Sequence, residues 1–180
     1  MEKTAPTNYR EHIRTVDDWP EKGVTFYDIA PLLGNGAVFG TLIEDMAAPL
    51  EGKVDQIIGF DARRFLFAGA MAARLGCGMS MLRKPGKLPG EIYEASYDLE
   101  YGRNTLTLQT NSIRPGERVA LVDDVVATGG TALAGAELVR RAGGEIVEFC
   151  SVVDLPHLGG SSKLALSDIA VRSMVTIGDV

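Results

Sequence analysis

The chain has 180 residues, of which 46% are hydrophobic and 23% are charged, and its formal net charge is −6. This length and composition predict one globular domain, residues 1–180, that is large enough to bury a substantial core. The acidic balance argues against nucleic-acid binding, and the lack of an 18-residue apolar run or an apolar amino-terminal signal favours a cytoplasmic protein over a membrane or exported one.

Alternating strands and helices predict the architecture. Short apolar runs predict strands at Asp55–Phe60, Met79–Leu82, Val119–Val122, Ile146–Val153 and, as a shorter run, Ala170–Val175. Apolar or amphipathic segments predict helices at Val38–Ala48, stopped by Pro49, at Phe65–Leu75, closed by Gly76, and at Thr131–Ala142, ended by Gly143. This order is typical of an α/β fold with a central, mostly parallel, doubly wound sheet flanked by helices.

Residues 84–118 interrupt this alternation. The segment is rich in Gly, Pro, Tyr and charge, with only weak strand character around 91–97 and 105–109. Because an insertion of this length in a compact domain usually has a function, we expect this segment to be functional.

The segment Val119–Thr131 carries the clearest chemical signal. A continuously apolar strand leads to Asp123 and Asp124, which we expect at its carboxyl end, where open α/β sheets bind ligands. Small residues and two hydroxyls follow, so that backbone N–H groups and a helix amino terminus can surround a phosphate; they are Ala127, Thr128, Gly129, Gly130 and Thr131.

Three other interpretations of this segment are weaker. A Walker-type loop requires lysine after its second glycine, where this chain has Thr131, and the Gly-x-Gly-x-x-Gly spacing of a dinucleotide fold is absent. An ordinary strand–turn–helix with solvent-facing aspartates is the remaining alternative. The sequence favours a site for a phosphorylated sugar.

The acid–acid pattern followed by Thr-Gly-Gly-Thr resembles the phosphoribosyl pyrophosphate (PRPP) signature of the type I phosphoribosyltransferases. Further segments resemble the adenine phosphoribosyltransferases of that family. They are Ile13–Pro20, Lys22–Leu33, Gly59–Arg63, Arg83–Gly90 and Ser96–Gly102, so the similarity extends from about residue 13 to residue 160.

The resemblance implies a type I phosphoribosyltransferase fold and the transfer of ribose 5-phosphate from PRPP to N9 of adenine, giving AMP and pyrophosphate. Asp123 and Asp124 would hold the ribose hydroxyls, and residues 127–131 the 5-phosphate. Mg²⁺ would be bound through PRPP and water rather than in a protein cage. The family also implies that the insertion forms a mobile lid, and that the protein is a homodimer with lid residues near the partner subunit.

The remaining roles also come from the resemblance. Pyrophosphate would meet a loop of Asp61, Ala62 and Arg63, which in the family often contains a non-proline cis peptide bond, and the cations Arg83, Lys84 and Lys87. Glu100 would be the acid/base and Tyr101 its partner in the lid, with Arg63 assisting catalysis. The base would lie among Thr25, Phe26, Tyr27 and Leu155, or Leu158. From the residues alone, Phe26 could equally be core, and the basic and Glu-Tyr segments could be solvated loops.

Three positions depart from the family pattern. Tyr27 replaces an arginine, Arg64 replaces the glycine after Arg63, and Asp154 replaces a glutamate. Arg64 could obstruct the pyrophosphate loop or add a donor to an anion, and Tyr27 could alter the purine that fits. Two alternatives accompany adenine transfer. Tyr27 or Asp154 could make hypoxanthine or guanine the substrate, and some transcription regulators resemble this fold and keep its ligand loop, which would make the chain a noncatalytic PRPP-sensing regulator.

Overall fold

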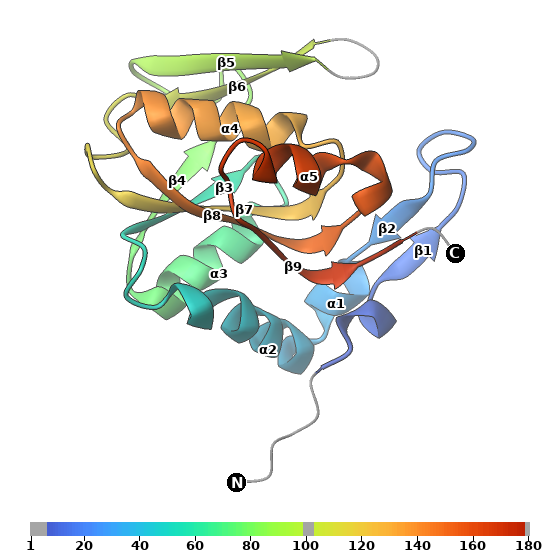
Figure 1. The fold of residues 1–180 in the computed structure, drawn as a ribbon. Helices are drawn as coiled ribbons and strands as arrows, with labels where there is room; N and C mark the ends of the chain where they lie inside the picture. Colours follow the sequence, from blue (N-terminus) through green and yellow to red (C-terminus); the bar gives the residue numbers. More distant parts are fainter. Residues whose placement is uncertain (1–6, 99–102, 179–180) are drawn as a thin grey trace, which may run out of the picture.

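Five parallel strands form the central sheet, in the spatial order β4–β3–β7–β8–β9 (Figure 1). They are β3 (Gln56–Phe60), β4 (Gly78–Leu82), β7 (Arg118–Val126), β8 (Glu145–Asp154) and β9 (Val171–Thr176). The structure is a computed structural model that describes residues 7–98 and 103–178. Strands β3 and β7 are mostly apolar and almost wholly buried, because helices cover both faces of the sheet.

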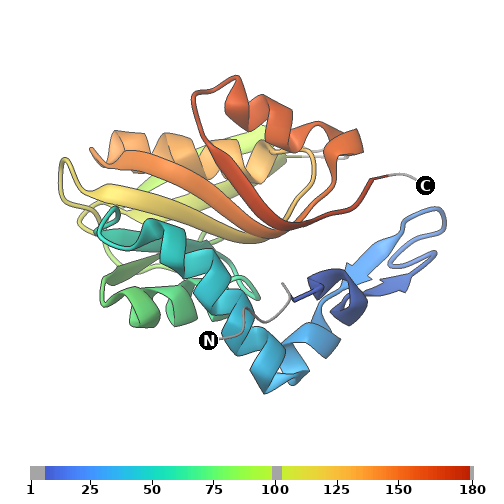
Figure 2. The same cartoon turned by 60° about the horizontal axis from the view of Figure 1, so that its bottom comes forward.

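The helices form two layers, as Figures 1 and 2 show. On one face, α2 (Gly36–Ala47) and α3 (Phe65–Leu75) bury Met46 and Phe67 in one hydrophobic cluster. On the other face, α4 (Gly130–Arg141) and α5 (Gly160–Ala165) bury Leu138 and Leu164 in a second. The predicted doubly wound α/β fold is confirmed. Within the described residues, no helix has the length and apolar character of a membrane span.

The predicted elements are present, with some differences at their ends. Strand β7 continues four residues beyond the predicted Val122, and α2 and α4 begin one or two residues earlier than predicted. Helix α2 ends at Ala47, so Pro49 lies in a separate 3₁₀ turn, Ala48–Leu50. The sequence analysis missed the hairpin of β1 (Arg14–Val16) and β2 (Phe26–Asp28) and helices α1 (Ala30–Gly34) and α5, which are too short for a periodic signal.

The predicted insertion contains an antiparallel hairpin of β5 (Ile92–Asp98) and β6 (Arg103–Gln109) that packs on the outer side of α4 (Figure 1). Leu106 and Leu108 are buried there, and Arg141 Nη1 donates a 2.6 Å hydrogen bond to the carbonyl of Glu94. The weak strand signal at 91–97 thus corresponds to β5, one residue further along, and the signal at 105–109 to the last five residues of β6. Among the described residues of the predicted insertion, Arg118 alone belongs to the central sheet.

Gly135 allows α4 to approach the sheet closely. A Cβ atom at this position would lie 2.6 Å from the Phe60 ring and 2.8 Å from Leu82 Cδ1. A helical glycine usually costs stability relative to alanine, but here only a hydrogen fits between the helix and the β3–β4 side of the sheet.

We expect Gly135→Ala to destabilise the protein by about 1–3 kcal/mol, because the added methyl group overpacks the contact with Phe60. Gly69→Ala in α3 is the matched control, since its Cβ would make only a 3.8 Å contact with Met79 Sδ. This control should stabilise the protein by about 0.5–1 kcal/mol through helix propensity. Urea unfolding of both variants measures the difference, and equal effects would contradict this account of Gly135.

Candidate active site

Asp123 and Asp124 lie within β7, not beyond its end. The strand runs on to Val126, and each of the two residues is only 2% exposed, which corrects the expectation that they emerge where the strand stops. Successive side chains of a strand point to opposite faces of its sheet. Asp123 accordingly lines a hollow with Ala127, Thr128, Gly129 and Thr131, whereas Asp124 lines a second hollow beside Phe26. We call these the loop hollow and the aromatic hollow.

The loop of residues 127–131, which the sequence predicts to bind phosphate and which we call the phosphate loop, connects β7 to α4. Gly129 has a φ of 80°, the left-handed conformation that turns the chain into the helix, and Gly130 begins α4. Thr128, Gly129 and Thr131 line the loop hollow together with Asp123. The amino terminus of α4 therefore faces the hollow, and its N–H groups and positive dipole end suit an anion.

Gly160, which the sequence analysis missed, supports this loop from behind. Its N–H donates a 2.9 Å hydrogen bond to the carbonyl of Ala127, and Lys163 Nζ donates one of 3.1 Å to the carbonyl of Thr128. A Cβ at position 160 would lie 2.3 Å from the Ala127 oxygen. In the sequence, this position was marked only by the pair Gly159-Gly160. The contact joins segments more than 30 residues apart, so local sequence patterns could not predict it.

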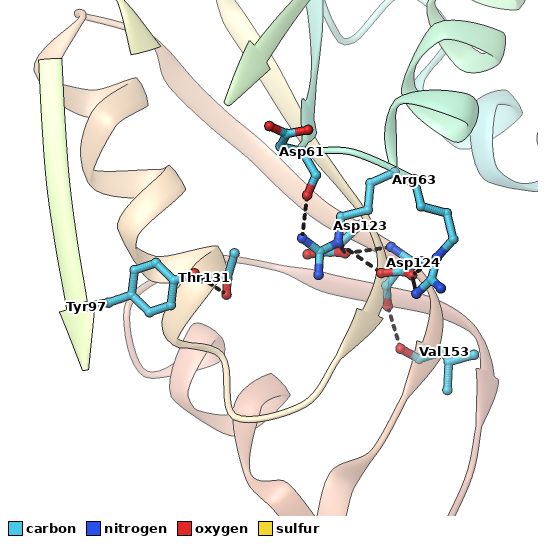
Figure 3. Close-up of polar contacts among 9 residues, drawn as sticks. Asp61, Arg63, Tyr97, Asp123, Asp124, Thr131 and Val153 are labelled. Atoms are coloured by element: carbon cyan, nitrogen blue, oxygen red, sulfur yellow. Dashed lines mark hydrogen bonds and ion pairs between the residues drawn. The ribbon is translucent and has the colours of Figure 1, made fainter. Parts of the chain in front are cut away.

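Two consecutive arginines from the loop after β3 are paired with the two aspartates (Figure 3). Arg63 donates from Nε to Asp124 Oδ2 at 2.6 Å and also pairs with it through Nη2. Arg64 Nε is ion-paired with Asp123 Oδ1 and donates to Asp124 Oδ1 at 2.9 Å. Arg64 therefore bridges both carboxylates, while Arg63 contacts one.

The two carboxylates differ in acidity because their surroundings differ. Burial raises the pKa of Asp123, and the charge of Arg64 only partly opposes this effect. Burial acts on Asp124 in the same direction, but its hydrogen bond with Asp123 and the charges of Arg64 and Arg63 outweigh it, so the pKa of Asp124 is lowered. Asp124 is therefore the more firmly ionised member of the pair.

The predicted pyrophosphate residues lie beside this pair. The Asp61–Ala62 peptide bond is cis, and Arg64 Nη1 donates a 3.2 Å hydrogen bond to the Asp61 carbonyl. Arg83 Nε donates to Asp61 Oδ2 at 3.3 Å, so this cation is already paired with a carboxylate. Lys84 and Lys87 are exposed on the following turn. The structure thus pairs Asp61 with Arg83 and Arg63 with Asp124, and leaves the two lysines exposed.

The aromatic hollow contains all four residues predicted to contact the base, namely Thr25, Phe26, Tyr27 and Leu155. Phe26 is half-buried, its ring centroid lies 4.3 Å from that of Trp19, and the Arg63 guanidinium carbon lies 5.8 Å from its centroid. Phe26 is therefore a wall of the hollow and not a core residue. A slot with apolar sides and nearby backbone edges suits a flat heterocycle.

Glu100 and Tyr101, the predicted lid residues, lie outside the described residues. The neighbouring strand β5 nevertheless contacts the phosphate loop, because the hydroxyl groups of Tyr97 and Thr131 form a 3.1 Å hydrogen bond (Figure 3). This contact connects the hairpin to the amino terminus of α4. The sequence analysis did not identify Tyr97, since the contact depends on how the hairpin packs on α4.

Asp123 and Asp124 are the carboxylates at the centre of the site that could contact a metal ion. In the part of the chain that the structure describes, no group of three or more His, Cys, Asp or Glu side chains is arranged to hold one. Mg²⁺ commonly keeps several waters and binds substrate phosphates with one or two carboxylates. The residues present fit that mode of magnesium binding and not an all-protein cage.

Comparison with known proteins gives a consistent result. The sequence profile of the phosphoribosyl transferase domain family matches residues 33–173. An adenine phosphoribosyltransferase from a Chelativorans species is 44% identical over 165 residues, which cover 91% of each chain.

Solved structures are similar over nearly the whole chain. The adenine phosphoribosyltransferase of Thermoanaerobacter pseudethanolicus is 40% identical, with a TM-score of 0.89, and the match covers 94% of this chain and 98% of that one. The Saccharomyces cerevisiae enzyme, solved with adenine and an imino-altritol bisphosphate, is 36% identical, with a TM-score of 0.87 and coverage of 93% and 98%.

We expect Gly160→Ala to weaken the binding of ribose 5-phosphate about tenfold, because its methyl group displaces the Ala127 carbonyl and with it the phosphate loop. Ser161→Ala, at the next position of α5, is the control and should bind like the wild type. Isothermal titration calorimetry measures both affinities, and thermal unfolding checks that each variant is folded. Unchanged affinity in Gly160→Ala would show that the loop does not depend on this contact.

Proposed function

The chain belongs to the adenine phosphoribosyltransferases of the phosphoribosyltransferase family, and we propose that it transfers ribose 5-phosphate from PRPP to N9 of adenine. The products are AMP and pyrophosphate, so the reaction is a step of purine salvage. The observation that carries this proposal is the position of Asp123 and Asp124 between an anion-binding loop and an aromatic slot. A ribose between the two carboxylates would direct its 5-phosphate to one hollow and its C1 to the other.

Binding of the sugar phosphate uses β7 and the loop after it. Carboxylate oxygens accept hydrogen bonds, so Asp123 and Asp124 would hold the ribose 2- and 3-hydroxyls. Residues 127–131 would hold the 5-phosphate with backbone N–H groups and the hydroxyls of Thr128 and Thr131. Both interactions position C1 without contacting the bonds that change.

Departure of pyrophosphate separates two charges. The bond from C1 to the pyrophosphate oxygen breaks, positive charge develops on the ribose, and both bonding electrons leave with pyrophosphate. The loop of Asp61, Ala62 and Arg63, with Arg83, Lys84 and Lys87, would stabilise the leaving anion. Mg²⁺, when bound through PRPP oxygens and water, would supply further positive charge to the pyrophosphate.

The base completes the reaction from the aromatic hollow. Adenine would stack beside Phe26 with its edge toward the backbone near Thr25 and Tyr27, and Leu155 would close the opposite side. N9 then forms a bond to C1 and loses its proton. We assign acid/base chemistry at the purine nitrogens to Glu100, with Tyr101 beside it in a lid that excludes water.

We propose further that residues 1–180 act as one phosphoribosyltransferase domain, as a homodimer in the cytoplasm. The half-exposed Leu66 at the start of α3 and the exposed Met81 of β4 supply apolar surface for a subunit contact. Cys77 and Cys150 are free thiols, which are usual in a reducing compartment.

Pyrophosphate release, measured with PRPP, Mg²⁺ and each of four bases in parallel, tests the proposal. We expect turnover with adenine to exceed turnover with hypoxanthine, guanine and xanthine by at least about 100-fold, because we propose that the aromatic hollow binds a 6-amino purine. Chelation of Mg²⁺ with EDTA should abolish turnover. If another base is preferred, Tyr27 and the residues around it would determine which purine binds. PRPP binding without turnover of any base would indicate a regulator.

Two variants separate binding from chemistry. Asp124→Asn should weaken PRPP binding about tenfold or more, because it replaces a charged hydrogen-bond acceptor for the ribose. Glu100→Gln should lower kcat about 100-fold while PRPP affinity stays within about twofold, because it removes only the acid/base group. Asp168→Asn, at an exposed position, is the control for loss of one negative charge. Equal small effects of the first two variants on affinity and kcat would contradict these roles.

A further inference from the structure

The guanidinium group of Arg64 lies on both carboxylates. We propose that Arg64 occupies the place of the ribose hydroxyls in the empty site and must leave it when a ribose 5-phosphate group binds. This inference rests on the proposed function only in assigning the ribose to Asp123 and Asp124. Arg64 would thus set the affinity for every ligand that carries the ribose 2- and 3-hydroxyls.

Most carboxylate oxygens of Asp123 and Asp124 already have donors from the protein itself. Asp123 Oδ1 accepts from the Asp124 N–H at 2.7 Å and is ion-paired with Arg64 Nε. Asp124 Oδ1 accepts from Arg64 Nε at 2.9 Å, and Asp124 Oδ2 accepts from Arg63. A diol that hydrogen-bonds to Oδ1 of both residues must therefore compete with Arg64 Nε for these oxygens.

The position of Arg64, rather than that of Arg63, opposes ligand binding to the two carboxylates. Its side chain is 25% exposed, compared with 44% for Arg63, and it lines the loop hollow with Asp123. Arg63 lies instead in the aromatic hollow and, of the two carboxylates, contacts only that of Asp124. Arg64 is therefore the residue that holds both carboxylates and with which a ligand bound to both must compete.

Displacement requires only a side-chain movement. The backbone of Arg64 has φ −67° and ψ −19°, an ordinary helical conformation at the start of α3. In the empty site, the guanidinium compensates two buried carboxylates that would otherwise be costly to ionise. Ligand hydroxyls replace the guanidinium as hydrogen-bond donors. The apparent association constant is therefore the intrinsic constant multiplied by the fraction of molecules in which Arg64 has left the two carboxylates.

The same competition acts on the product. AMP keeps both ribose hydroxyls and the 5-phosphate, whereas pyrophosphate has no hydroxyls to compete with Arg64. Return of the guanidinium to Asp123 and Asp124 would therefore favour the release of AMP. Ligands with and without the ribose diol consequently distinguish this role from a general effect of charge on anion binding.

The test compares the affinities of Arg64→Ala and wild type for ribose 5-phosphate, AMP and pyrophosphate by calorimetry. If the carboxylates are free in roughly a tenth of wild-type molecules, ribose 5-phosphate and AMP should bind Arg64→Ala about tenfold more tightly. Pyrophosphate binding should not tighten. Arg74→Ala, which removes an arginine paired with Glu44 elsewhere on α3, is the charge control and should leave all three affinities unchanged.

Arg64→Gln provides a second variant if Arg64→Ala does not fold, and it should tighten ribose 5-phosphate binding in the same direction. In the wild type, the NMR signal of the Arg64 Nε–H group, assigned by its loss in Arg64→Gln, should shift on saturation with ribose 5-phosphate. Unchanged or weaker binding of ribose 5-phosphate in the folded variants, or an unmoved Nε signal, would overturn the proposal. These measurements use no base, so they are independent of whether the wild type turns over adenine.

Discussion

The pairing of two buried aspartates with two consecutive arginines is the interaction on which the site depends. Asp123 and Asp124 lie in a central strand, where an unpaired carboxylate would be strongly destabilising. Arg63 and Arg64 supply the compensating charge from the loop after β3. Because β3 and β7 are adjacent and parallel, their carboxyl ends meet at the same edge of the sheet. The charge pairing therefore follows from the strand order.

Strand alternation then divides the site. Adjacent residues of β7 face opposite sides, so one carboxylate serves the loop hollow and the other the aromatic hollow. A molecule with a phosphate at one end, a diol in the middle and a heterocycle at the other end is the ligand that this division suits. The phosphate loop is held from behind by Gly160 and from the hairpin side by Tyr97. Two segments distant in sequence from the loop thus hold it in position.

Arg64 shows how a departure from a family pattern acquires a physical meaning. On the sequence, it could either obstruct a loop or add a donor to an anion. The structure turns its guanidinium toward the carboxylates rather than away from them. A charged group that stabilises the empty site necessarily competes with the ligand for the same oxygens. Stability of the empty protein and affinity for the ribose are therefore opposed at this residue.

The sequence by itself determined the α/β class, the strands and the longer helices, because hydrophobic periodicity encodes them. Local spacing predicted the small-residue loop after the strand, and the residues of the aromatic hollow were predicted from the resemblance to the family. It could not show that β7 extends past Asp124, that Gly160 supports the loop or that Tyr97 bonds Thr131. Nor could it show that Arg64 bridges both carboxylates. Only the tertiary structure decided these contacts, because they join segments between about 30 and 60 residues apart whose proximity depends on strand order and helix packing.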